Sequence, residues 1–131
     1  MSQENVEIVR AAIEAMNRRD IQAVLRGMDP EVRFEHRLAA LEGNFVGLDG
    51  VRGWFADLGE YLVNGQIQCQ DVRDLGDRVL GLGTLGATGK ESGVETRQTF
   101  AALARYRDGL MTEYIDFGDV EQALEAAGLR E

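Results

Sequence analysis

Residues 96–129, TRQTFAALARYRDGLMTEYIDFGDVEQALEAAGL, decide the fold of this chain. A long strand pattern runs over residues 96–107, turns at Asp108-Gly109 and returns as a second strand over residues 110–117. A short helix closed by a glycine is then expected over residues 120–127. The order of strand, tight turn, strand and helix predicts an antiparallel hairpin followed by a C-terminal helix.

The first half of the chain has mainly helical periodicity. A helix is expected from Ser2 to the segment 17–19, with its apolar stripe at Val6, Val9, Ile13 and Met16. Asp20 caps a second short helix, which Gly27 ends. A third helix is capped by Asp49 and closed at Asn64-Gly65, and it has the strongest amphipathic pattern. Its apolar positions are Val51, Trp54, Phe55, Leu58, Tyr61 and Leu62.

Strand periodicity occurs in one early segment and throughout the second half. Apolar and polar residues alternate over residues 32–36, and further strands are expected over residues 66–75 and 78–88. The connectors between the later strands suit hairpin turns, which predicts antiparallel pairing. Residues 38–48 are expected to be irregular, and Glu42 among them is a candidate for covering a pocket.

The composition predicts one domain, residues 1–131. Hydrophobic residues make up 44% of the chain, and its 16 glycines are spread out, which predicts a packed core with turns and sheet bends. The net charge of -9 disfavours nucleic acid and anionic membranes as partners. The single cysteine, Cys69, excludes an internal disulfide, and no apolar run approaches about 18 residues. We therefore expect a cytoplasmic protein.

Helices early and strands late predict an α+β fold. We expect a strongly curved antiparallel or mixed sheet that forms a cone, with three N-terminal helices on its concave face and a short C-terminal helix. Gly81 and Gly83 share one face of a strand, which predicts a bend or the close approach of another group. The interior of the cone is the expected pocket.

Four segments make the chain resemble the SnoaL-like proteins of the nuclear transport factor 2-like superfamily. They are residues 11–20 (AAIEAMNRRD), 30–36 (PEVRFEH), 47–55 (GLDGVRGWF) and 106–129 (YRDGLMTEYIDFGDVEQALEAAGL). The resemblance covers essentially the whole chain. The superfamily includes polyketide cyclases, ketosteroid isomerases, dehydratases, epoxide hydrolases and non-catalytic binding domains, so the resemblance leaves the reaction open.

The resemblance implies roles for single positions. His36 lies where ketosteroid isomerases carry their proton-shuttling aspartate on the first strand. The two donors of the isomerase oxyanion hole correspond to Ala12 and Ala102, which carry only methyl groups. Because one such donor contributes a factor of about 10²–10³ in rate, isomerisation by the usual route is not expected.

The last strand supplies an acid/base candidate of the cyclase type. The resemblance places Asp116 at the position of the cyclase aspartate, and strand alternation puts Thr112, Tyr114 and Asp116 on one face. A carboxylate that faces an apolar interior can hold a proton near neutral pH. We therefore expect Asp116 to be the main acid/base group, with His36 as its partner and Tyr114 orienting the substrate.

Each of these candidates also has a structural interpretation. His36 is the only histidine and suits proton transfer, but a histidine at a strand end can simply be satisfied by neighbours or water. Asp116 could instead pair with an arginine of a neighbouring strand, either Arg97 or Arg105. One histidine with scattered carboxylates lacks metal-ligand spacing, and no phosphate-binding loop is present. No metal and no cofactor are expected.

The expected ligand is a hydrophobic, carbonyl-bearing small molecule. Its contacts are expected from Phe34, Trp54, Leu58, Tyr61, Phe100, Ala102, Tyr106 and Thr112. The chain is then either an isomerase, cyclase or dehydratase, or a non-catalytic binding or dimerisation domain of the same fold. The family implies a homodimer through the outer face of the sheet. Ala101 and Leu103 would form an exposed apolar strip on that face and would need cover.

Overall fold

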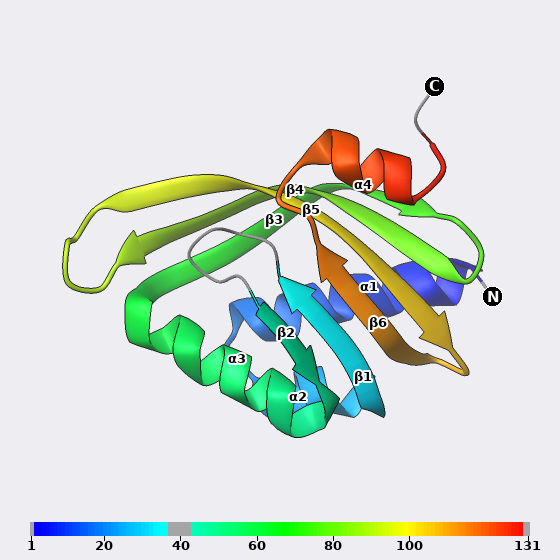
Figure 1. Cartoon of the computed structure of the whole chain (residues 1–131), viewed down its shortest axis with the longest axis horizontal. Coiled ribbons are helices and arrows are strands. Elements are labelled where there is room, and N and C mark those ends of the chain that lie inside the picture. The colour runs from blue at the N-terminus through cyan, green and yellow to red at the C-terminus, as the bar shows by residue number, and fades with distance from the viewer. Residues whose placement is uncertain (1, 37–42, 130–131) are drawn as a thin grey trace.

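The structure, a computed structural model, describes residues 2–36 and 43–129. Its elements are α1 Ser2–Asn17, α2 Ile21–Arg26, β1 Met28–His36, β2 Gly43–Val46, α3 Gly47–Tyr61, β3 Leu62–Asp74, β4 Arg78–Gly89, β5 Glu95–Arg107, β6 Leu110–Asp116 and α4 Val120–Ala126. Three helices come early and four strands follow one another late (Figure 1). The predicted α+β class is therefore confirmed.

The described strands form one six-stranded mixed sheet in the order β2-β1-β6-β5-β4-β3. Neighbouring strands pair antiparallel, except that β1 and β6 run parallel. The tight turn between β5 and β6 is built as the sequence predicts, with Asp108 and Gly109 at φ values of 53° and 80°. The parallel contact places the ends of β1 and β6 side by side in the middle of the sheet.

The sheet is covered by helices on both faces (Figure 1). The helices α1–α3 pack on one face and enclose the main apolar core. On the other face, Leu80, Ala101 and Leu103 are buried in a second cluster that includes Ala123 and Ala127 at the C-terminal helix. The expectation that Ala101 and Leu103 form an exposed strip is therefore wrong, because α4 of the same chain covers them.

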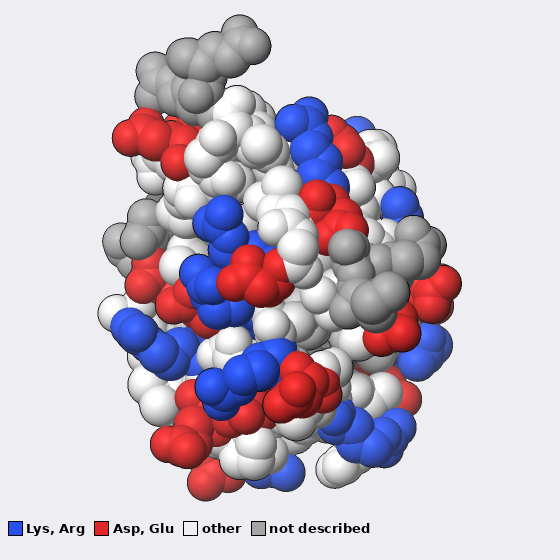
Figure 2. Space-filling view, turned by 90° about the vertical axis from the view of Figure 1, so that its right-hand side faces the viewer, with Lys and Arg blue, Asp and Glu red and all other residues white. Residues whose placement is uncertain are grey.

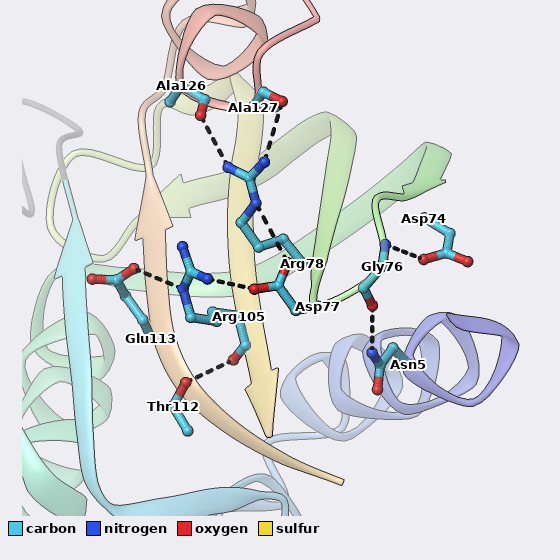
Figure 3. Close-up of polar contacts among 10 residues, drawn as sticks. All are labelled: Asn5, Asp74, Gly76, Asp77, Arg78, Arg105, Thr112, Glu113, Ala126 and Ala127. Carbon is cyan, nitrogen blue, oxygen red and sulfur yellow. Dashed lines mark hydrogen bonds and ion pairs between the residues drawn. The ribbon is translucent and has the colours of Figure 1, made fainter. Parts of the chain in front are cut away.

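The end of α4 is fixed to the sheet by an arginine of β4. The Arg78 guanidinium donates to the carbonyl oxygens of Ala126 and Ala127 at 3.1 and 3.4 Å (Figure 3). These carbonyls lie at the helix end, where no further turn supplies donors, so a cation is favourable there. This contact explains how a helix of only seven residues holds its place on the sheet.

Three local expectations are wrong. Residues 43–46 are not irregular but form β2, which pairs with the open edge of β1. The third helix begins at Gly47, two residues before its expected cap Asp49. β3 begins at Leu62, and Asn64, at φ 56°, lies inside that strand instead of ending the helix. For β2 and for the start of β3, a pairing partner distant in sequence overrides the local pattern. Residues 37–42, including Glu42, lie outside the described residues.

The surface carries charges of both signs. Figure 2 shows basic and acidic side chains interspersed over one face of the molecule. Such a face presents no extended field of one sign to a charged partner. Within residues 2–36 and 43–129, none of the helices combines the length and the apolar character needed to cross a membrane.

Candidate functional site

The parallel pairing of β1 and β6 brings His36 and Asp116 together. His36 lies beside Asp116 in the register, and Phe34 lies beside Tyr114. The His36 Nε2 atom is 3.5 Å from the Asp116 Oδ2 atom, and the side chains are only 3% and 1% exposed. Two ionisable groups therefore meet in the interior, at the ends of two central strands.

Neither arginine considered as a partner for Asp116 takes that place. Arg105 pairs with Asp77 at 2.6 Å and with Glu113 at 3.9 Å (Figure 3). Arg97 lies in the exposed first half of β5, opposite Gly86. The ionisable group that lies beside the Asp116 carboxylate among the described residues is His36.

Three buried polar atoms near this pair have no hydrogen-bond partner among the described residues. They are His36 Nδ1, Asp116 Oδ2 and Trp54 Nε1. The other carboxylate oxygen, Asp116 Oδ1, accepts a hydrogen bond from the Gly118 N–H at 3.0 Å. Leaving a buried polar group without a partner costs about 1–3 kcal/mol, and native proteins do so rarely. A bound molecule or water would supply the missing partners.

Burial shifts the pKa values of the two ionisable groups in opposite directions. It raises the pKa of Asp116 to about 6, against opposing backbone hydrogen bonds with Gly118 and Ala101. It lowers the pKa of His36 to about 4. Near neutral pH the pair is a carboxylate beside a neutral imidazole. We assign the imidazole proton to Nε2, which faces the carboxylate, so Nδ1 keeps a lone pair that can accept a proton.

An outer cavity adjoins the pair. It is lined by Met16, Asn17, Arg19, His36, Trp54, Phe55, Leu58, Gly65, Ile67, Leu85, Phe100, Tyr114 and Asp116. The cavity has a volume of about 30 Å³, which is room for about two water molecules. The Trp54 ring stacks on the His36 ring with centroids 5.1 Å apart. The walls are thus largely apolar, with a few polar side chains among them.

An inner cavity of about 40 Å³ lies next to the outer one. The two share the lining residues Met16, Phe100 and Tyr114. The inner cavity is lined by apolar groups and by Tyr106, whose hydroxyl has no described hydrogen-bond partner. Ala12 and Ala102 both line it. The two positions that the family resemblance equates with oxyanion donors therefore present methyl groups to one apolar chamber.

The predicted ligand-binding residues divide between the two cavities. Trp54 and Leu58 line the outer cavity, Phe34, Ala102 and Tyr106 line the inner one, and Phe100 lines both. Phe34 also stacks on Tyr114 with ring centroids 4.5 Å apart, and Tyr114 lines both cavities. The side chain of Tyr61 lies outside the part of the chain that the structure describes.

Thr112 lies apart from both cavities, and its predicted face is wrong. The register between β5 and β6 shifts beside Thr112, so simple alternation fails there. As a result Met111 and Tyr114 are both buried. They lie three positions apart, which would put them on opposite faces of a regular strand. The Thr112 hydroxyl instead donates to the Arg105 carbonyl at 3.3 Å.

Residues at the end of α1 line the outer cavity and were not predicted from sequence. The Asn17 side chain donates to the Ile67 carbonyl at 3.0 Å and accepts from the Ile67 N–H at 2.8 Å. It thereby fixes the end of α1 against β3. Arg19, two residues further along the chain, is exposed and lies at the rim of the outer cavity. The sequence offers only a helix-end signal here, because the contact joins segments far apart in the chain.

Comparisons with protein families and with solved structures agree on one family for this chain. The sequence profile described as SnoaL-like domain matches residues 9–114. No curated protein matches the chain. A nuclear transport factor 2-like protein of unknown function from Burkholderia pseudomallei is 24% identical, with 93% of this chain and 95% of that chain covered and a TM-score of 0.81.

Two similar structures were crystallised with small molecules. TerC, co-crystallised with polyporic acid, is 26% identical over 95% of this chain and 98% of that chain, with a TM-score of 0.80. A protein with a ketosteroid isomerase-like fold from Catenulispora acidiphila, in complex with trimethylamine, is 21% identical over 95% and 94%, with a TM-score of 0.78. At 21% identity, the similarity to the Catenulispora protein shows a shared fold alone.

Proposed function

Because the chain belongs to the SnoaL-like domain family, we propose that it binds a hydrophobic, carbonyl-bearing small molecule and transfers protons on it with His36 and Asp116. One observation carries this proposal: three buried polar atoms without a described partner belong to residues that line a single, largely apolar cavity. The small molecules bound by TerC and by the Catenulispora protein support a ligand-binding role for the fold.

The proposed chemistry needs only the groups of the pair and the ligand. Near neutral pH the ionised Asp116 and the free Nδ1 of neutral His36 are both bases. A proton removed from a carbon next to the ligand carbonyl would reside on the pair. It would return to another carbon in isomerisation, to the alkoxide oxygen formed when a ring closes onto a second carbonyl in cyclisation, or to the leaving hydroxyl in dehydration. Isomerisation, cyclisation and dehydration all follow this course without a cofactor.

Trp54 is the proposed donor to the ligand carbonyl. The negative charge that develops on a carbonyl oxygen needs a preorganised donor, and Ala12 and Ala102 supply none. The Trp54 Nε1–H is buried, has no described partner and belongs to a ring stacked on His36. Tyr114, which lines both cavities, would orient the apolar part of the ligand.

The curvature of the sheet into a cone is part of the same proposal. β3 carries two register shifts against β4, and such bulges bend and twist strands. Gly81 approaches the Cys69 sulfur and the Phe100 ring, which is the close contact expected where a sheet folds over its contents.

Hydrogen exchange on a model ketone tests proton transfer without knowledge of the natural substrate. We expect the protein to accelerate exchange of the α-hydrogens of 2-tetralone in D2O, followed by NMR. Asp116→Asn and His36→Gln should each lower the catalysed rate by about 10²-fold. Glu113→Gln, on the same strand but outside both cavities, should leave the rate unchanged. Equal rates for Asp116→Asn and the parent would contradict the proposal.

The alternative is a binding domain without turnover. The methyl groups that Ala12 and Ala102 present in place of hydrogen-bond donors favour it. It predicts that 2-tetralone changes the fluorescence of Trp54, the only tryptophan, while exchange stays at the buffer rate.

A homodimer through the outer sheet face remains a proposal that rests on the family. The apolar strip invoked for it is covered by α4, so the remaining outer surface, on the distal parts of β3, β4 and β5, would have to form the contact. Size-exclusion chromatography at micromolar concentration tests this, and a clean monomer would contradict it.

A further inference from the structure

We propose that the ligand of the outer cavity carries a carboxylate, which Arg19 binds at the rim. This inference rests on the proposed ligand-binding function and adds the chemical class of the ligand. Arg19 is exposed, lines the outer cavity and belongs to the same wall as Asn17 and Gly65. The ligand would therefore place its apolar, carbonyl-bearing part near His36 and Asp116 and its carboxylate at the entrance.

The backbone at Arg19 adopts a conformation that arginine seldom takes. Its φ is 62°, the left-handed region that usually holds glycine or asparagine after a helix. The Arg19 N–H donates to the Met16 carbonyl at 3.0 Å, and the Asp20 N–H donates to the Ala15 carbonyl at 2.9 Å. Helix termination alone would be better met by glycine, so the side chain of Arg19 calls for a separate explanation.

The guanidinium of Arg19 rests on a glycine of β3. A Cβ at Gly65 would lie 2.9 Å from one terminal nitrogen of Arg19 and 3.5 Å from the other. Any side chain at position 65 would push the guanidinium away from this place. Asn17 bonds to both backbone groups of Ile67, which holds the two segments in register. The missing side chain at Gly65 thus leaves the space that the guanidinium occupies at the rim.

Arg19 has no carboxylate partner in the described part of the chain, although the protein has 23 acidic residues. Its neighbour Arg18 lies 3.8 Å from Asp20 and lines neither the outer nor the inner cavity. The other ionisable groups of the outer cavity are His36, Tyr114 and Asp116, and Asp116 would repel an anion from the deep end. An anionic group is therefore favoured at the rim, where a guanidinium can bind it with two hydrogen bonds.

The test compares an acid with its neutral amide. The probes are 3-phenylpropanoate and 3-phenylpropanamide, and their dissociation constants are measured by Trp54 fluorescence and by calorimetry. We expect the parent to bind the acid about tenfold more tightly than the amide. Arg19→Gln should bind both equally, and Arg19→Lys should retain part of the preference. Gly65→Ala should reduce the preference because it displaces the guanidinium.

Arg18→Gln is the matched control, because it changes the net charge by the same amount one residue away. It should keep the tenfold preference, and circular dichroism should show that all variants are folded. Equal binding of acid and amide by the parent would overturn the carboxylate inference while leaving the pocket proposal intact. The same loss in Arg18→Gln would also overturn it. Failure of both probes to bind the parent would overturn the inference together with the proposed ligand pocket.

Discussion

Replacing Gly83 with alanine is expected to destabilise the folded protein by about 3 kcal/mol. A Cβ at Gly83 would lie 1.8 Å from the Gln68 carbonyl oxygen and 2.8 Å from the Cys69 Cα. Both are backbone atoms of β3, which pairs with β4 at this point. A flexible side chain cannot relieve this overlap by rotating away, so the two strands must move apart and lose pairing.

Gly86 provides the control on the same strand. The nearest atom to its added Cβ is the Thr96 carbonyl oxygen at 3.8 Å, an ordinary contact. Gly86→Ala should therefore be neutral or stabilising by about 0.5 kcal/mol, because alanine restricts the unfolded chain. Urea unfolding followed by circular dichroism gives both free energies. Equal stability of Gly83→Ala and Gly86→Ala would contradict the packing described for β3 and β4.

The glycine pattern shows how far local sequence predicts this fold. Two glycines on one face of β4 predicted a close approach, and the approach is confirmed at Gly81 and Gly83. The hairpin at Asp108-Gly109 and the C-terminal helix were predicted within a residue or two. These features depend on neighbours along the chain, which periodicity and turn residues report directly.

The features that were missed depend on distant partners. β2 exists because β1 offers it an edge, and the four residues 43–46 have no strong pattern of their own. The shift at Thr112 arises from the pairing of β6 with β5, and alternation within β6 gives no sign of it. The cover of Ala101 and Leu103 by α4 likewise depends on how the chain folds back.

The candidate site was predicted in part. His36 and Asp116 were singled out through the family resemblance, and the residues alone left each with a structural interpretation. Their contact follows from the parallel register of β1 and β6, which no local pattern specifies. Arg19 was taken only as part of a helix end. Its place on the cavity rim depends on Gly65, which approaches from a different element.

Removing either member of the buried pair is expected to produce opposite pH dependences of stability. The pKa of Asp116 is raised in the folded state. Its contribution to the stability of the folded protein is therefore present below about pH 3.8 and is lost as the pH rises through about 6. The pKa of His36 is lowered in the folded state. Its contribution to stability is therefore present above pH 6.5 and is lost as the pH falls through about 4. Between pH 4 and 6 the two effects nearly cancel in the parent.

Single variants expose each contribution. Relative to the parent, the stability of Asp116→Asn should rise by about 3 kcal/mol as the pH goes from 4 to 6. That of His36→Gln should fall by a similar amount over the same interval, because only the cost of ionising Asp116 then remains. Chemical unfolding at several pH values measures both differences. Parallel curves for the two variants would contradict opposite shifts in one buried pair.

An NMR titration of His36 shows whether His36 and Asp116 form one coupled site. His36 is the only histidine, so its ring signals need no assignment. We expect a His36 pKa well below 6.5 and a separate step in the ring shifts near pH 6, caused by Asp116 and absent in Asp116→Asn. A pKa near 6.5 that is unaffected by Asp116→Asn would contradict the site.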